Sequence, residues 1–209
     1  MNAGQHIVEE LAAIGRLFYE RNWVLGTSGN FSAVLTTDQL TLAITASGVH
    51  KGELSAENFL TVDATGRPKE NSKAPSAETA IHLTIIQETG ARAVLHTHSV
   101  WSAFLTDVFA DADGIAIEGF EMLKGLRGVT THEHREWLPV MENSQDYGAL
   151  SAGIASVLRT HSEAHGVLLR RHGLYTWGQS VDEAKRHIEI LEFLLEVIGR
   201  TRFAGGLMA

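Results

Sequence analysis

The chain has 209 residues, of which 44% are hydrophobic and 20% are charged, as in ordinary globular proteins with one sizeable core or two small ones. Its net charge of −8 argues against non-specific binding to nucleic acid through a basic surface, but is compatible with a local basic pocket for a phosphorylated small molecule. Because the chain has no cysteine, disulfides and thiolate nucleophiles are excluded, and a cytoplasmic location fits. The first residues do not resemble a signal peptide, and no apolar stretch is long enough to predict a membrane span.

Segments of helical character alternate along the chain with short apolar runs. The helical segments, recognised by apolar spacing or by cap and stop signals, are residues 4–21, 76–88, 100–110, 148–161 and 181–200. The apolar runs, which predict strands, begin at Val34 or cover residues 40–45, 58–62, 93–98, 166–169 and 174–177. Ser76 is the expected N-cap of the second helix. We therefore expect one α/β domain over residues 1–209, with residues 203–209 as a loose tail.

Residues 92–99 are the stretch around which the candidate site is built. The apolar run Ala93–Leu95 predicts a buried strand that leads directly into His96, Thr97 and His98. Because side chains alternate along a strand, His96 and His98 should point to the same face. Two neutral imidazoles side by side suit a divalent metal such as zinc, whose catalytic sites typically have three protein ligands and an open position. The alternative is that both histidines are simply hydrogen-bonded at the end of the strand.

A third ligand should come from the end of another strand. His172 fits, because it follows the apolar run 166–169 and precedes Gly173, although it could equally be an ordinary loop histidine. A competing pair with the same spacing, His132 and His134, lies in a charged stretch rather than after an apolar run. We therefore favour a surface or supporting role for that pair.

Five short segments, in the same order along the chain, resemble the class II aldolase/adducin family. They are Gly26–Asn30, Thr45–Val49, Pro75–Glu78, His96–His98 and Arg171–Gly173. The resemblance implies a single three-layer α/β/α domain with a central, mostly antiparallel sheet, assembled as a homotetramer with active sites near the subunit interfaces. It also implies that His96, His98 and His172 hold a zinc ion, and that Glu78 is a further ligand or an acid/base. The alternative for Glu78 is a first-turn residue favoured by the helix dipole.

Three segments, Ser47–Lys51, Gly119–Lys124 and Arg170–Gly173, are similar to the members of this family that dehydrate 5-methylthioribulose 1-phosphate in methionine salvage. This similarity implies a zinc-dependent lyase that forms 2,3-diketo-5-methylthiopentyl 1-phosphate and water. It also implies that Glu121 is the catalytic acid/base, with Glu78 as fourth ligand or second base. One alternative is a zinc-dependent sugar-phosphate aldolase or epimerase on the same scaffold, with Glu78 as the main base. Another is a non-catalytic, adducin-like interaction module.

The phosphate of such a substrate requires hydrogen-bond donors. Small residues in two loops and at the start of the second helix can offer backbone N–H and hydroxyl groups, and Lys51 adds a positive charge. The expected phosphate ligands are Gly29, Asn30, Ser47, Gly48, Lys51 and Ser76. For each loop the alternative is a plain structural turn. Neither a nucleic acid nor a membrane is an expected partner.

Overall fold

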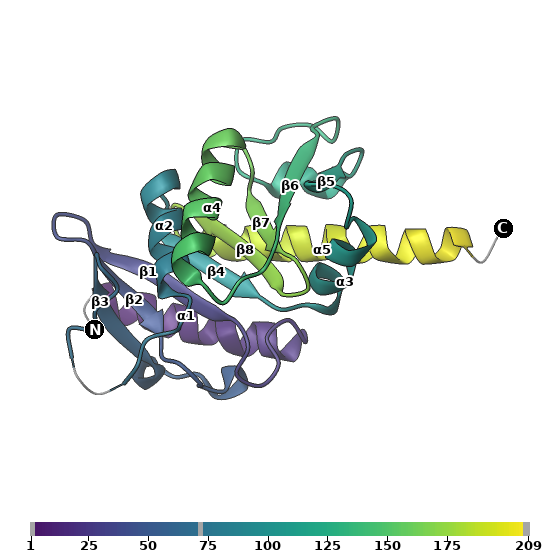
Figure 1. The fold of residues 1–209 in the computed structure, drawn as a ribbon. Coiled ribbons are helices and arrows are strands. Elements are labelled where there is room, and N and C mark those ends of the chain that lie inside the picture. Colours follow the sequence, from purple (N-terminus) through teal and green to yellow (C-terminus); the bar gives the residue numbers. More distant parts are fainter. Residues whose placement is uncertain (1–2, 71–72, 207–209) are drawn as a thin grey trace.

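The computed structural model describes residues 3–70 and 73–206, and within them it has eight strands, five α-helices and three short 3-10 helices (Figure 1). The strands are β1 (Asn30–Thr36), β2 (Thr41–Thr45), β3 (Phe59–Asp63), β4 (Ala93–Thr97), β5 (Gly114–Ile117), β6 (Glu136–Met141), β7 (Gly166–Leu169) and β8 (Gly173–Gly178). The α-helices are α1 (Ala3–Glu20), α2 (Thr79–Thr89), α3 (Val100–Val108), α4 (Tyr147–Thr160) and α5 (Val181–Gly206). The 3-10 helices are η1 (Lys51–Glu53), η2 (Ala56–Asn58) and η3 (Glu121–Gly125).

The strands of the described residues form one sheet in the order β3-β2-β1-β4-β8-β7-β6-β5. The β6–β7 pair is parallel and the other neighbouring pairs are antiparallel, which confirms the predicted α/β fold with a mostly antiparallel sheet. The strand that carries the His-x-His motif, β4, lies in the middle of this order between β1 and β8. The backbone of β1 and β8 therefore lies on either side of His96, the first histidine of the candidate site.

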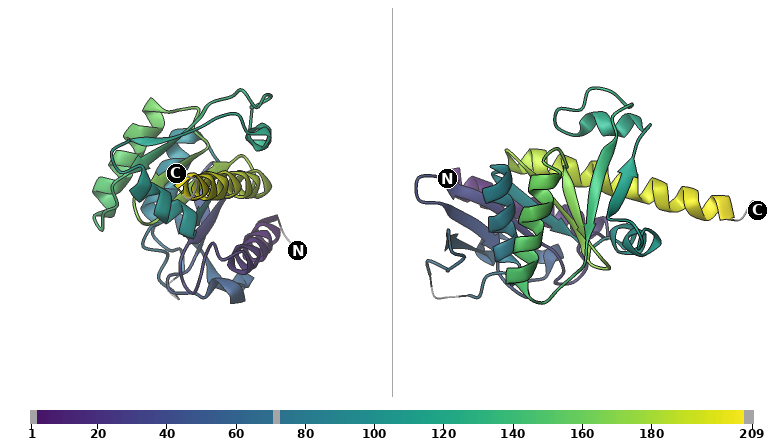
Figure 2. Two further views of the ribbon diagram at one scale, coloured as in Figure 1. Left: turned by 90° about the vertical axis from the view of Figure 1, so that its right-hand side faces the viewer. Right: turned by 45° about the horizontal axis from the view of Figure 1, so that its top comes forward.

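Helices cover both faces of the sheet and give the three layers that were predicted (Figure 2). Ala93 and Leu95 of β4 face the layer of α1, α3 and α5, where they share a core with Leu191. Val94 faces the opposite layer of α2 and α4, where it shares a second core with Ile154. Burying a large aliphatic side chain such as Leu191 contributes about 1.5–3 kcal/mol relative to leaving it exposed. Because side chains alternate along β4, His96 lies on the same face as Val94 and points towards α2.

Several elements differ from the predicted ones. Strand β1 begins at Asn30 rather than Val34, because residues 30–33 pair with residues 93–96 of β4. Helix α2 begins at Thr79 with Glu78 as its N-cap, so the predicted cap at Ser76 is wrong. Strands β5 and β6 were not predicted, and β6 contains Pro139, a residue that normally argues against an interior strand.

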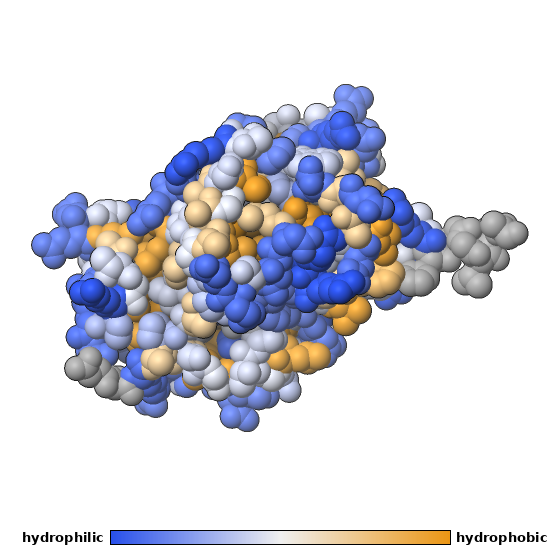
Figure 3. All heavy atoms as spheres, viewed as in Figure 1, coloured by the Kyte–Doolittle hydropathy of each residue, from blue (hydrophilic) through white to orange (hydrophobic). Residues whose placement is uncertain are grey.

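Helix α5 continues to Gly206, so it includes residues 203–206 of the expected loose tail, and residues 207–209 lie outside the described part. Its C-terminal part projects away from the sheet (Figure 1). Within the described residues, no helix is long and apolar enough to cross a membrane. Hydrophobic and hydrophilic residues are interspersed on the face shown in Figure 3.

Candidate metal centre

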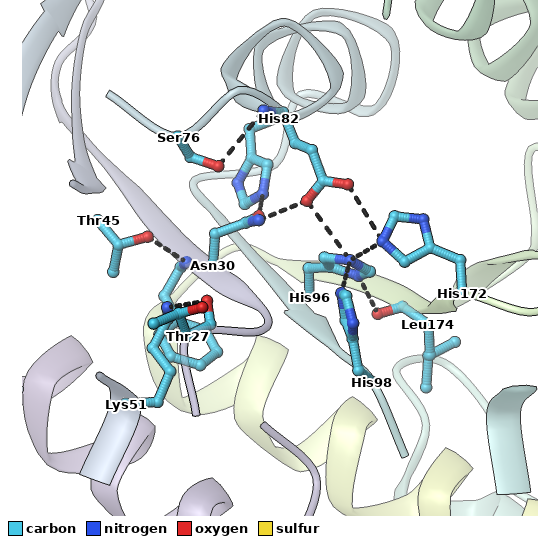
Figure 4. A network of polar contacts seen from close by, with 12 residues as sticks. Thr27, Asn30, Thr45, Lys51, Ser76, His82, His96, His98, His172 and Leu174 are labelled. Atoms are coloured by element: carbon cyan, nitrogen blue, oxygen red, sulfur yellow. Dashed lines mark hydrogen bonds and ion pairs between the residues drawn. The ribbon is translucent and has the colours of Figure 1, made fainter. Parts of the chain in front are cut away.

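Three histidines and one glutamate from distant parts of the chain converge on one point. Figure 4 shows the three histidines, His96, His98 and His172. His96 Nε2 lies 2.8 Å from His98 Nε2, 3.3 Å from His172 Nε2 and 3.5 Å from Glu78 Oε2. Glu78 Oε1 lies 3.3 Å from His172 Nε2, and the four ligand atoms all lie within 4.8 Å of one another. In a tetrahedral zinc site with bonds of 2.0–2.2 Å, the ligand atoms are about 3.3–3.5 Å apart. Three of these separations fit groups around one shared divalent ion, and the fourth, 2.8 Å between His96 and His98, is shorter.

The turn between β7 and β8 places the third histidine. Arg171 has a left-handed backbone with φ of 53°, and its N–H donates to Thr106 Oγ1 at 2.9 Å, which holds the turn against α3. His172 follows, and Gly173 then runs so close to β4 that a Cβ there would lie 2.0 Å from the Thr97 carbonyl oxygen. Only glycine permits this approach, which brings His172 beside His96.

The orientation of His96 is fixed from two sides. Its Nδ1–H donates to the Leu174 carbonyl oxygen at 3.0 Å, so Nε2 carries the lone pair that faces His98 and His172. Its ring stacks on Tyr175, its cross-strand partner, with the centroids 3.7 Å apart and the planes at 7°. A backbone acceptor that selects the tautomer is the usual support of a metal-binding histidine.

Burial keeps all three imidazoles neutral. Burial, together with the nearby charges of His172 and Lys51, lowers the pKa of His98 to about 3. Burial, with His98 and His172 nearby, holds the pKa of His96 well below its usual range. The pKa of His172 is also lowered by burial, against the opposing effect of the Glu78 carboxylate. Because metal ligation requires the neutral imidazole, these shifts favour metal binding near neutral pH.

Glu78 belongs to the same cluster although it is the N-cap of α2. Its side chain is 10% exposed and makes no capping hydrogen bond, so it does not serve the helix end. Instead, one carboxylate oxygen accepts a hydrogen bond from Asn30 Nδ2 at 2.5 Å, and the carboxylate faces the histidines. Asn30 lies opposite His96 in the β1–β4 pairing, which explains how its side chain reaches this carboxylate.

A pocket of about 310 Å³ opens next to the cluster. Glu78, His98, His172 and Tyr147 contribute to its wall. The wall also contains the whole set of residues predicted to bind the phosphate, Gly29, Asn30, Ser47, Gly48, Lys51 and Ser76. A larger cavity of about 470 Å³ elsewhere in the molecule is lined by different residues, around His165 and His187. The pocket beside the histidines is therefore the better candidate for a substrate site.

Two of the predicted phosphate donors are engaged within the chain. The N–H of Ser47 donates to the Ala74 carbonyl oxygen at 2.9 Å, and that of Ser76 donates to the Thr45 carbonyl oxygen at 3.2 Å. These bonds attach the segment before α2 to the end of β2, which helps to place Glu78. The prediction that both residues offer backbone N–H groups is therefore wrong, and their hydroxyl groups are the donors that a ligand could use.

Lys51 is the cation of the pocket, and it is only 1% exposed. Its Nζ donates to the carbonyl oxygens of Thr27 at 2.9 Å and Val49 at 3.0 Å, which uses two of its three N–H groups. Burial lowers the pKa of Lys51 to about 8, although the nearby Glu78 carboxylate opposes this shift. An anion in the pocket would favour the charged form further.

Glu121 is not brought to this cluster. It lies in η3 with a side chain that is 72% exposed, and its Oε1 accepts from Lys124 Nζ at 2.6 Å. Its Oε2 lies 3.7 Å from Nδ1 of His132, one histidine of the competing pair. The other, His134, has its Nε2 2.9 Å from Oε2 of the buried Glu136. The competing pair therefore serves other contacts in the described structure, as favoured from the sequence.

His82 and Ser32 were not among the predicted site residues, yet with Asn30 they form a buried chain of hydrogen bonds behind Glu78. One signal was present in the sequence. His82 follows Glu78 by four positions, so a helix beginning there places both on one face.

Comparison with known proteins agrees with this architecture. The family model described as Class II Aldolase and Adducin N-terminal domain matches residues 9–198. A methylthioribulose-1-phosphate dehydratase of Hahella chejuensis is 42% identical over 188 residues, which cover 90% of this chain and 89% of the relative. One of Marinobacter nauticus is 43% identical over 197 residues, which cover 93% and 91%.

Solved structures share the fold at lower identity. The l-fuculose-1-phosphate aldolase from Thermus thermophilus matches with a TM-score of 0.77 and 24% identity, covering 96% of this chain and 97% of its own. A sugar-phosphate aldolase from Thermotoga maritima matches with a TM-score of 0.71 and 19% identity, covering 98% of each chain. From the family model and the identity to the relatives, the chain belongs to the class II aldolase and adducin family.

Proposed function

We propose that this chain is a metal-dependent dehydratase that converts 5-methylthioribulose 1-phosphate into 2,3-diketo-5-methylthiopentyl 1-phosphate and water, a step of methionine salvage. The observation that carries the proposal is identity above 40%, over about nine-tenths of the chain, to relatives named for this activity. The converging histidines and the pocket beside them supply the chemistry that such a reaction needs.

The ion that we propose is zinc, held by His96, His98 and His172 with Glu78 as a fourth ligand. Three imidazoles and a carboxylate are a usual zinc ligand set, although iron, cobalt or manganese use the same groups, and metal analysis of the purified protein distinguishes them. A bound divalent ion supplies Lewis-acid polarisation of the substrate's carbonyl and neighbouring hydroxyl oxygens, which acidifies the hydrogen on C3.

The protein's own groups then have to move protons. A carboxylate removes the C3 proton, the resulting enolate expels the C4 hydroxyl as water after protonation, and the enol product becomes the diketone. We propose Glu121 for this acid/base role and keep Glu78 as a ligand or second base. Because Glu121 lies outside the pocket of its own chain, it would reach the substrate in an assembled homotetramer, from the edge of a neighbouring subunit.

The position of Glu121 also bears on its protonation. Its hydrogen bond with Lys124, together with the charges of Lys124 and His132, lowers the pKa of this exposed carboxyl. Covering it with a second subunit would remove water and raise its pKa towards the range that an acid/base needs. The assembly is therefore part of the proposal, as is a cytoplasmic location, which rests on composition alone.

The phosphate end of the substrate would lie against the loops on the other side of the pocket. We propose Lys51, the hydroxyl groups of Ser47 and Ser76, and the backbone of Gly29, Asn30 and Gly48 as its binding groups. The phosphate does not react, but its tight binding orients the C3 hydrogen of the substrate towards the base.

Product analysis tests this function directly. The purified protein is incubated with 5-methylthioribulose 1-phosphate, with and without a chelator, and the diketone is followed by mass spectrometry. We expect metal-dependent loss of one water per substrate. Retro-aldol products without the diketone would instead identify an aldolase, and full activity of metal-free protein would refute the proposed chemistry.

A further inference from the structure

A chain of buried polar side chains runs from Ser32 in the sheet to the carboxylate of Glu78, and Figure 4 shows its middle members, His82 and Asn30. Ser32 Oγ lies 2.7 Å from His82 Nδ1, and His82 Nε2 lies 2.5 Å from Asn30 Oδ1. Asn30 Nδ2 then donates to Glu78 Oε2. Ser32 and His82 are 0% exposed and Asn30 is 5% exposed, so bulk water is not a ready substitute for any of these partners.

The direction of every hydrogen bond in this chain is determined. Asn30 points its amino group at Glu78, so its carbonyl oxygen faces His82 and can only accept. His82 must therefore carry its proton on Nε2, which leaves Nδ1 as an acceptor. Nδ1 in turn requires the hydroxyl of Ser32 as donor. Burial lowers the pKa of His82 to about 3, so the ring stays neutral and holds one proton for this ordered arrangement.

We propose that His82 is a positioning residue of the metal centre, which acts through Asn30 to hold the Glu78 carboxylate against the three histidines. The inference rests on the proposed metal centre, but not on the identity of the substrate. Without the proton on His82 Nε2, the Asn30 amide loses the partner that selects its orientation. A flipped amide would present its oxygen to the Glu78 carboxylate, and two acceptors would then face each other.

The chain of contacts predicts which replacements are tolerated. In His82→Gln, the side-chain amide can donate to Asn30 Oδ1 from nearly the same place as Nε2, so the orientation of Asn30 is kept. His82→Leu fills a similar volume but cannot donate. Ser32→Ala removes only the hydroxyl that selects the tautomer, which is a milder change at a second point of the chain.

The test measures affinity for Co²⁺, whose visible absorption reports the ligand set, by titration of the metal-free full-length protein. We expect His82→Leu to weaken binding about 10–100-fold, the usual effect of losing a group that supports a metal ligand. His82→Gln should stay within about threefold of the unmodified protein, and Ser32→Ala should fall between them. As a matched control, His187→Leu removes another buried histidine, one that contacts Trp177 and Arg127 instead, and should leave Co²⁺ affinity unchanged.

The decisive comparison is made in a Glu78→Ala background. If His82 acts through Glu78, His82→Leu should weaken Co²⁺ binding less than about twofold further there, because the effects of coupled residues are not additive. An equal loss in both backgrounds would show a merely structural role and overturn the inference, as would absence of Co²⁺ binding to the unmodified protein. If His82→Leu fails to fold by circular dichroism, Ser32→Ala replaces it in the same cycle. A protein that shows the coupling but does not dehydrate 5-methylthioribulose 1-phosphate would support this inference and refute the proposed function.

Discussion

Removal of the metal should destabilise the whole domain, because the ligands are joined only by folding. Glu78 precedes α2, His96 lies near the end of the central strand β4 and His172 lies in the β7–β8 turn. An unfolded chain keeps only the His96-x-His98 pair as a weak local site, so nearly all binding free energy stabilises the folded state.

The magnitude follows from mass action. At a free metal concentration about 1,000 times the dissociation constant, binding adds about 4.1 kcal/mol to the free energy of unfolding. In a domain of this size each kcal/mol shifts the thermal midpoint by about 2–4 °C, so the expected difference is about 8–16 °C. Each further tenfold increase in free metal should add about 1.4 kcal/mol.

Thermal unfolding followed by circular dichroism, in metal-buffered solution and with excess chelator, measures this difference. His172→Gln is the control, because its side chain is 16% exposed and the substitution removes one ligand at a surface turn. We expect its midpoint without metal to stay close to that of the metal-free parent and its response to metal to be mostly lost. Equal midpoints with and without a saturating metal concentration, or an undiminished response in His172→Gln, would refute the reasoning.

Three further predictions concern titratable side chains. Glu121→Gln should lower kcat about 10²–10⁴-fold, the usual contribution of an acid/base, without changing metal content; near-normal turnover would exclude that role. Lys51→Met should lower kcat/KM about 10–100-fold, because it removes a charge-assisted bond to the phosphate. In the unmodified protein, kcat/KM should fall above pH about 8, where Lys51 of the ligand-free protein loses its proton. A kcat/KM that does not change with pH in this range would contradict the role of Lys51 in phosphate binding. Folding lowers the pKa of His82 from 6.5 to about 3 and that of His187 from 6.5 to about 4. Below pH 6.5 the unfolded chain therefore binds more protons at these two residues than the folded chain does. Stability measured by urea unfolding should therefore fall as pH drops towards 4, by up to about 2.7 kcal/mol per pH unit for the pair, and His187→Gln should reduce that slope.

The sequence predicted those parts of the fold in which local pattern and tertiary packing agree. The helices α1, α3 and α4 lie within two residues of the predicted bounds, because a regular apolar spacing faces a core in each. It did not predict β5 and β6, where the pairing partner rather than the local pattern makes the strand. The early start of β1 has the same cause, since residues 30–33 pair with β4 and residues 32 and 33 also pair with β2.

The candidate site was also predictable only where the local sequence pattern determines which way a side chain points. The phase of a strand was enough to place His96 and His98 together, the end of a second apolar run indicated His172, and resemblance to the family added Glu78. The role of Asn30 was not predictable, because its side chain donates to the Glu78 carboxylate. Such a contact depends on strand register, which a single sequence does not specify.

Glu121 raises a different question, because local geometry alone does not give it a role. Its surroundings in the chain are solvent, Lys124 and His132, whereas three of the four proposed metal ligands line a pocket to which it does not contribute. If Glu121 is nevertheless the acid/base, it must act at the metal centre of a neighbouring subunit. In a closed ring of identical subunits, each centre would then be completed by one neighbour.

Subunit mixing tests this arrangement. Glu121→Gln keeps the metal ligands but lacks the acid/base, and His172→Gln keeps the acid/base but lacks a ligand, so each variant alone should be almost inactive. Co-expression in equal amounts should give hybrids in which roughly a quarter of the centres combine an intact ligand set with an intact Glu121 from a neighbour. If Glu121 serves its own chain, no hybrid contains a complete centre and activity stays at the level of the separate variants. Activity in the hybrids that exceeds that of both separate variants would therefore show that Glu121 of one subunit acts at the metal centre of another.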